Sequence, residues 1–200
     1  MSYLEDSLAH LEIFEGTVPW MYLDTRGLVT VGVGEMLANA ARAQSLAFVD
    51  SSGQPITQDV ILAEFNRVSS LAPAKVAGFY RSSTSPVLPH PAIDTLLMNH
   101  LTFFDGQLGG RFPAYANFPD PAKLGLLDMI YNLGVTGLFR GFPHFMARVD
   151  AQDWLSASAQ CHRVGPSETR NDWTKQQFLA AASVAASNGA ATPVTPANGG

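Results

Sequence analysis

The first apolar pattern along the chain has the spacing of a helix. It runs through four residues: Leu4, Leu8, Leu11 and Phe14. Apolar positions three and four residues apart predict an amphipathic helix of about ten residues. Glu15 is expected at its C-terminal end, because Gly16 and Pro19 follow and break helices.

Between Trp20 and Val33 the pattern changes to β-branched and aromatic residues around the polar segment 24–27. This texture predicts a β-hairpin with a glycine in its turn. Gly32 and Gly34 fall in the second strand, where glycine indicates a bulge or a close backbone approach.

A second helix is expected to begin after Thr57, a favourable N-cap residue. Its inward positions are Val60, Ile61, Phe65, Val68 and Leu71. Residues 82–91 contain three prolines and four Ser/Thr residues, which predicts a loop or a boundary between lobes. Helical spacing then resumes at four residues: Ile93, Leu97, Leu101 and Phe104.

Residues 106–121 are rich in Gly, Pro and aromatic residues and are expected to form a connection. A strongly apolar helix should follow through Leu124, Leu127, Ile130 and Tyr131, closed by Gly134 and Gly137. Further helices are expected near 151–161 and 168–184, and 185–200 should be a disordered tail or linker.

These elements predict an α+β, mostly α protein. Residues 1–184 should form one domain with a small lobe at about 15–75 and a helical lobe at about 1–14 and 76–184. A cleft between two lobes is a usual place for a substrate.

The composition excludes several classes of protein. Two hundred residues suit one compact domain, and Cys161 is the only cysteine, so the chain cannot form an internal disulfide. The net charge is −5 with only 12 scattered basic residues, which argues against nucleic-acid binding and, mildly, against binding to polyanionic surfaces. We see no signal peptide and expect no membrane span, so we expect the protein to be made in the cytoplasm. We also expect it to be a monomer.

The most informative chemistry lies in the first two elements. Glu15 and Asp24 are carboxylates on different elements, and Thr30 follows on the next strand, roughly opposite Asp24. Cleavage of a glycosidic bond needs a proton donor together with a base or nucleophile. The apolar neighbours of Glu15 would favour its protonated form. The alternative stays open, because such acid pairs arise by chance and Asp is common in turns.

No cofactor or metal site is expected from the spacing of the five histidines, which lack HxH and HExxH patterns. They are His10, His90, His100, His144 and His162. Cys161 precedes His162, but neighbouring side chains on a helix do not face each other, so we interpret Cys161 as a buried thiol.

Two segments resemble a known family. The first reads Glu15-Gly16, then Tyr22-x-Asp24-Thr25-x-Gly27-x-x-Thr30-x-Gly32-x-Gly34, and resembles the catalytic signature of the T-even phage lysozymes. The second, residues 127–138, resembles the central helix and following turn of that family. Weaker correspondence extends over about residues 4–182.

The resemblance implies a two-lobed lysozyme fold that hydrolyses the β-1,4 bond between N-acetylmuramic acid and N-acetylglucosamine. Glu15 would be the general acid, and Asp24 with Thr30 would hold or deprotonate water in an inverting reaction. Arg170 would orient Glu15. Substrate-binding positions implied in this way are Tyr22, Gly34, Tyr131, Asn132 and Arg170.

Two departures from the family leave alternatives open. Glu35 stands where the family commonly has a histidine, so the ion pair made by that histidine should be missing. Residues 77–120 are longer and richer in Pro and Gly than their counterpart. The alternatives are a lytic transglycosylase, which needs only one acid, and a module that binds wall sugars or a protein without turnover.

The setting implied by the resemblance is the bacterial cell wall. The protein would reach peptidoglycan, in the periplasm or wall, as a phage endolysin or as a secreted effector. An effector would be expected to have an immunity protein as its partner.

Overall fold

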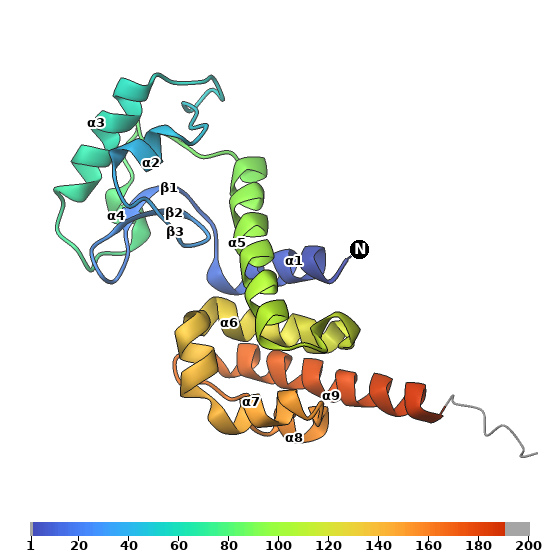
Figure 1. The fold of residues 1–200 in the computed structure, drawn as a ribbon. Helices are drawn as coiled ribbons and strands as arrows, with labels where there is room; N and C mark the ends of the chain where they lie inside the picture. Colours follow the sequence, from blue (N-terminus) through green and yellow to red (C-terminus); the bar gives the residue numbers. More distant parts are fainter. Residues whose placement is uncertain (1, 191–200) are drawn as a thin grey trace, which may run out of the picture. The chain divides into compact units, whose positions relative to one another are not determined.

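The protein is described by a computed structural model that covers residues 2–190 (Figure 1). This part of the chain is mostly helical and contains a small antiparallel sheet, so the α+β, mostly α class is confirmed. In chain order the elements are α1 (Tyr3–Glu15), β1 (Val18–Leu23), β2 (Val29–Gly32), β3 (Glu35–Met36), α2 (Ala40–Gln44), α3 (Gln58–Ser69), α4 (Ala77–Tyr80), α5 (His90–Arg111), the short 3-10 helix η1 (Tyr115–Asn117), α6 (Asp120–Gly141), α7 (Pro143–Asp150), α8 (Trp154–Ser158) and α9 (Glu168–Ala190).

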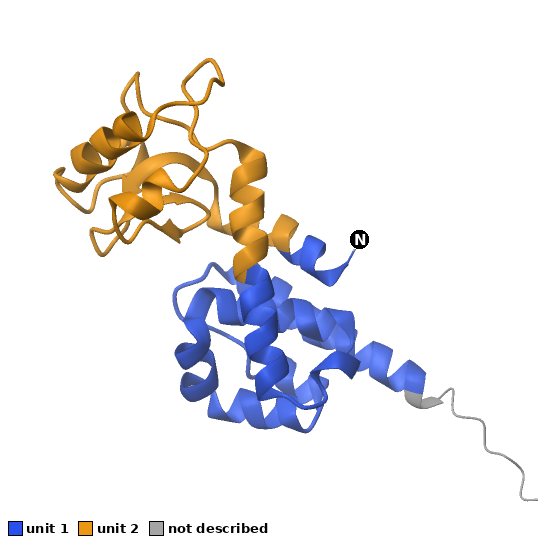
Figure 2. Ribbon diagram, turned by 45° about the horizontal axis from the view of Figure 1, so that its top comes forward, with its two compact units in different colours: residues 1–7, 101–200 blue, residues 8–100 orange. Residues whose placement is uncertain are grey.

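The chain divides into two compact units (Figure 2). We call residues 8–100 (orange, unit 2 in the key of Figure 2) the first unit, and residues 1–7 and 101–200 (blue, unit 1 in the key) the second unit. The first unit therefore extends beyond the expected small lobe of 15–75. It also includes the later part of α1, the α4 helix and the start of α5.

The sheet of the first unit has the strand order β1-β2-β3, and each neighbouring pair is antiparallel. The hairpin expected from the sequence is confirmed, with Tyr22 opposite Thr30 in the register. The third strand was not expected, because two residues are too few to show a pattern. Gly32 has a φ of +67°, and a Cβ there would lie 3.2 Å from Ile93 Cγ2, so the predicted close approach is confirmed.

Helix α3 follows Thr57 as expected, with the backbone of Thr57 extended and its carbonyl accepting the Ile61 N–H at 3.2 Å. Ile61 and Val68 are buried in the core of the first unit. Val60 is 46% exposed, so its predicted inward position is wrong. Successive helical residues point about 100° apart, and Ile61 already occupies the buried face.

The second unit shows three differences from the sequence prediction. Gly134 interrupts α6 with φ 70° and ψ 168°, but the helix resumes and Gly137 does not end it. Helix α5 continues to Arg111, so residues 106–111 are helical instead of a connection. Helix α9 extends to Ala190, so 185–190 are helical too, while 191–200 lie outside the described residues.

Three shorter helices were not expected at all. Helices α2 and α4 have five and four residues, and α7 begins at Pro143 directly after α6. Among residues 2–190, no helix combines the length and apolar character needed to cross a membrane.

Candidate active site

Asp24 lies in the turn between β1 and β2, and the turn fixes its carboxylate. Its Oδ1 accepts the backbone N–H groups of Arg26 at 2.8 Å and Leu28 at 2.9 Å. Gly27, with φ +77°, donates its N–H to the Asp24 carbonyl at 3.0 Å. The second oxygen, Oδ2, lies 3.4 Å from Arg26 Nε, and the side chain is 22% exposed. Backbone N–H groups thus hold Oδ1 of Asp24 in place, and Oδ2 lies near the exposed guanidinium group of Arg26.

Glu15 is the last residue of α1, and Gly16 with φ +71° turns the chain toward β1. Glu15 is exposed, so the partly desolvated setting expected from its apolar neighbours is not provided. Trp20 is engaged elsewhere: its Nε1 donates to the Ala77 carbonyl at 3.0 Å, and Arg81 stacks 4.5 Å from its ring centre.

Tyr22 connects the two predicted catalytic acids. Burial raises the pKa of its phenol, and the negative charges of Asp24 and Glu15 raise it further. Both carboxylates therefore act on the same phenol. Tyr22 lies on β1 with Asp24 in the turn that follows, and Glu15 ends the helix that precedes β1.

Thr30 is 3% exposed and lies on β2, as expected. Its register partner is Tyr22, whereas Asp24 pairs with Leu28, so Thr30 is two pairs away from the predicted position opposite Asp24. The Thr30 hydroxyl donates to the Leu28 carbonyl at 3.0 Å. Because its proton is used in this bond, the hydroxyl can only accept a hydrogen bond from a water molecule.

A pocket of about 400 Å³ opens beside Asp24, lined by residues 22–25 and 74–77. The wall of the pocket that residues 74–77 form was not predicted from the sequence. Tyr80 fixes this wall, because its hydroxyl donates to the Ala72 carbonyl at 3.0 Å and accepts the Lys75 N–H at 3.3 Å. Tyr80 is fully buried, and the only sequence signal for it was an aromatic residue just before a Ser/Pro-rich loop.

Glu35 makes an ion pair in the first unit. Its carboxylate accepts Arg42 Nη2 at 2.6 Å and lies 2.8 Å from His100 Nε2. The hydrogen bond with His100 and the charge of Arg42 outweigh burial and lower the pKa of Glu35. The ion pair at position 35 is therefore one in which Glu35 supplies the acid, and not one in which a histidine supplies the base.

The remaining predicted residues belong to the second unit. Tyr131 is half-buried and packs edge-on against Phe104, with ring centres 6.0 Å apart, and Asn132 is exposed. Arg170 is buried, and its Nε donates to Asp128 Oδ1 at 2.7 Å. The predicted pairing of Arg170 with Glu15, and the roles of Tyr131, Asn132, Gly34 and Arg170 toward a substrate, stay predictions.

Asp128 is the centre of a buried polar network in the second unit. Its Oδ2 accepts Arg163 Nη2 at 2.6 Å and the Thr174 hydroxyl at 2.6 Å. Arg163 and Asp128 are 1% exposed. Sequence analysis missed this network, because its members are far apart in the chain and only the fold brings them together.

Cys161 is 2% exposed and donates to the Ser158 carbonyl at 3.4 Å. Burial raises its pKa to about 11. Both observations confirm the interpretation of Cys161 as a buried thiol.

One group of metal-ligating side chains occurs in the first unit. Donor atoms of Glu12, His90 and Asp94 all lie within 4.8 Å of one another. The sequence did not indicate this group, because Glu12 is distant from the other two in the chain.

No protein-family model matches this chain, and no curated protein sequence matches it either. The function therefore has to be inferred from the residues themselves.

Proposed function

We propose that the protein is a peptidoglycan hydrolase, a muramidase that cleaves the β-1,4 bond between N-acetylmuramic acid and N-acetylglucosamine. The proposal includes the two-lobed lysozyme fold that the signature at residues 15–34 implies. Glu15 donates a proton to the leaving oxygen, and Asp24 activates the attacking water in an inverting reaction. No cofactor takes part.

One observation carries this proposal: the turn that fixes the Asp24 carboxylate lies beside a pocket of about 400 Å³, and the charges of both Asp24 and Glu15 act on Tyr22, which lines that pocket. Glycoside hydrolysis requires two carboxyl groups that act on the same glycosidic bond, so both must lie near one point of the site.

The surroundings of Asp24 also suit a carbohydrate. The pocket of about 400 Å³ beside it offers space of the size that small-molecule sites usually have. Lys75 lines this pocket and supplies a positive charge next to Asp24 and Tyr22. Peptidoglycan carries carboxylates on its peptide stems, so a lysine beside the glycan suits this polymer better than a neutral polysaccharide.

The exposure of Glu15 bears on its proposed role. A general acid must deliver its proton to the leaving oxygen without competition from water, and water reaches the exposed Glu15 side chain in the free protein. The proposal therefore requires that a bound glycan cover Glu15 and exclude water from it.

The test is digestion of purified peptidoglycan by the wild-type chain and by Glu15→Gln, with products identified by mass. The expected result is release of reducing muropeptides by the wild type and a loss of at least about 100-fold in Glu15→Gln. Glu5→Gln is the matched control, since Glu5 is an exposed acid on the same helix, and it should retain wild-type activity.

Other products would change the assignment. Anhydro-sugar ends would indicate a lytic transglycosylase. Retention of full activity by Glu15→Gln would remove Glu15 from the mechanism, and wall binding without any released saccharide would indicate a binding module. We further propose that the protein acts on periplasmic or wall peptidoglycan, as an endolysin or as an effector with an immunity protein.

A further inference from the structure

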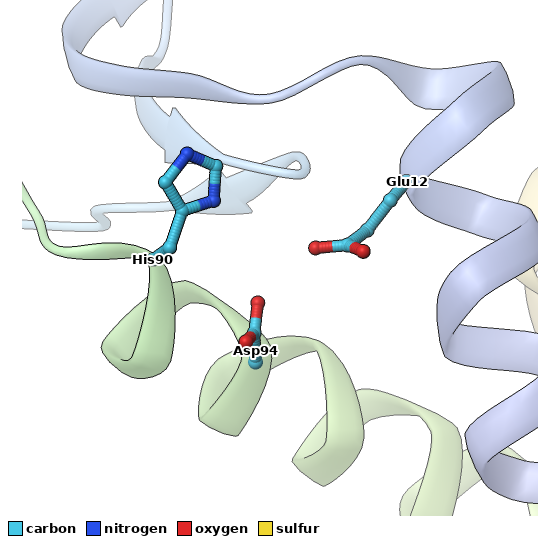
Figure 3. Close-up of side chains that lie close together, drawn as sticks. All are labelled: Glu12, His90 and Asp94. Carbon is cyan, nitrogen blue, oxygen red and sulfur yellow. The ribbon is translucent and has the colours of Figure 1, made fainter.

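Three side chains of the first unit converge from two helices (Figure 3). Glu12 comes from α1, whereas His90 and Asp94 come from the first turns of α5. His90 and Asp94 are four residues apart, so they lie on the same face of α5. Their donor atoms and that of Glu12 lie within 4.8 Å of one another.

This arrangement places two carboxyl groups against each other. Glu12 is half-buried, and its nearest charged groups are the Asp94 carboxylate and the His90 ring. Two carboxylates this close repel unless a proton or a cation lies between them. The two carboxyl groups are therefore favourable neighbours only when a proton or a cation lies between them.

A separate observation also points to a missing partner. Asp94 Oδ1 is buried, and among residues 2–190 no N–H or hydroxyl donates to it; the Asp94 carboxyl group can bond with Glu12 only when the two share a proton. Buried polar atoms nearly always have a hydrogen-bond partner, since leaving a carboxylate oxygen unpaired carries the full cost of removing it from water. The atom lies beside two other metal-ligating groups, so a metal ion would supply the interaction that the protein does not.

We propose that Glu12, His90 and Asp94 bind a divalent transition-metal ion of the Zn²⁺ class. The proposal does not depend on the proposed hydrolase activity. One imidazole nitrogen and two carboxylates suit Zn²⁺, whereas Ca²⁺ and Mg²⁺ prefer sites made only of oxygen ligands. Three protein ligands leave a fourth position, which water can fill because His90 is exposed.

The distances fit such an ion after a small adjustment. Zn²⁺ holds nitrogen and oxygen ligands at about 2.0–2.2 Å, so donor atoms around a tetrahedral ion lie roughly 3.4 Å apart. The donors here are no more than 4.8 Å apart. An exposed imidazole and a Glu side chain can close this difference by rotation. The bound ion would join α1 to α5 within the first unit.

The test is calorimetric titration of the full, chelator-treated chain with ZnSO₄. The expected result is one saturable site in the wild type. Asp94→Asn and His90→Ala should each weaken binding by more than the roughly 10-fold loss that follows removal of an outer partner of a metal ligand. Zn²⁺ should also raise the Tm of the wild type more than that of either variant.

His144→Ala is the matched control, because His144 is an exposed histidine on α7, far along the chain from the cluster. It should bind Zn²⁺ as the wild type does. Circular dichroism checks that each variant is folded, and Glu12→Gln replaces Asp94→Asn if that variant unfolds. Absence of saturable binding, or equal affinity in wild type and cluster variants, would overturn the proposal and leave a shared proton as the occupant.

Discussion

Asp24 and Asp50 hold two turns of the same geometry. In each turn, Oδ1 accepts the backbone N–H groups two and four residues later, at 2.8 and 2.9 Å. Each turn also has a glycine with positive φ three residues after the aspartate, Gly27 at +77° and Gly53 at +81°. Turn formation therefore accounts for the position of both carboxylates, and any catalytic role of Asp24 must show as a difference between them.

We predict that Asp24→Asn lowers peptidoglycan hydrolysis by at least about 100-fold, the usual contribution of a general base. Asparagine keeps the acceptor oxygen that holds the turn, so the variant should stay folded. Asp50→Asn makes the same change in the matching turn and should leave activity unaltered. Rates of muropeptide release, together with urea unfolding of both variants, check this prediction. Equal losses of activity in Asp24→Asn and Asp50→Asn would mean that the assay reports the stability of the turns and not a catalytic role of Asp24.

Glu35→Gln should lower the free energy of unfolding by about 1–3 kcal/mol at pH 7, the range for a hydrogen bond to a charged group. The substitution removes the charge that Arg42 and His100 share. The folded-state pKa of Glu35 lies below its ordinary value. Its contribution is therefore complete above the unfolded pKa of about 4.3 and is lost as pH falls through the lower folded value. Urea unfolding at several pH values should show the stabilities of the two proteins converging as the pH falls below the unfolded pKa and through the folded one.

The control for this prediction is a second Glu–His pair on the surface. Glu168 lies 3.4 Å from His162, but their side chains are 78% and 61% exposed. Glu168→Gln should change the stability by less than about 1 kcal/mol, because water and salt screen such pairs. A similar loss of stability in Glu35→Gln and Glu168→Gln would show that the burial of Glu35 does not strengthen its ion pair.

The sequence predicted the elements whose pattern was long or whose turn chemistry was specific. Helix α1 and the hairpin were foreseen because apolar spacing and the glycines at 16 and 27 mark their ends. Helices α2 and α4, with five and four residues, were missed because they are too short to show a period. The glycines at 106, 109 and 110 suggested a connection, yet packing of Leu101 and Leu108 keeps α5 helical through them.

The candidate site was predictable where its residues are close in sequence. Glu15, Tyr22, Asp24 and Thr30 lie on two consecutive elements, so their proximity follows from one hairpin. The pocket wall at 74–77 and the Glu12–His90–Asp94 cluster depend on contacts between distant segments. Such contacts are set by the tertiary fold, and no local pattern in the chain announces them.

Cys161 should react slowly with thiol reagents in the native protein. Its pKa of about 11 leaves roughly 200-fold less thiolate at pH 8 than an ordinary cysteine with a pKa of about 8.5. Only the thiolate attacks, and burial slows access further. Labelling with a chromogenic disulfide should be at least about 100-fold faster in urea than in buffer. Equal rates would contradict burial of this thiol.

Asp128→Asn should be among the most destabilising single substitutions of the second unit. It removes the carboxylate that binds Arg163, Arg170 and Thr174, leaving buried guanidinium groups undercompensated. Loss of one partner of a buried ion pair costs about 3–5 kcal/mol. Asp150→Asn is the control, because Asp150 pairs with Arg111 at the surface and should cost less than about 1 kcal/mol. Urea unfolding at pH 7 distinguishes the two.

Alanine at Gly125 and at Gly106 should change stability in opposite directions, although both glycines lie inside helices. A Cβ at Gly125 would lie 2.8 Å from the ring of Phe178, which is fully buried on α9 and cannot move aside. Overpacking should therefore cost about 1–3 kcal/mol and outweigh the gain in helix propensity. A Cβ at Gly106 meets no atom within 4 Å, so that variant should gain up to about 1 kcal/mol. Thermal unfolding of both variants tests the contact between α6 and α9, and a gain at Gly125 would show that Phe178 packs less tightly there.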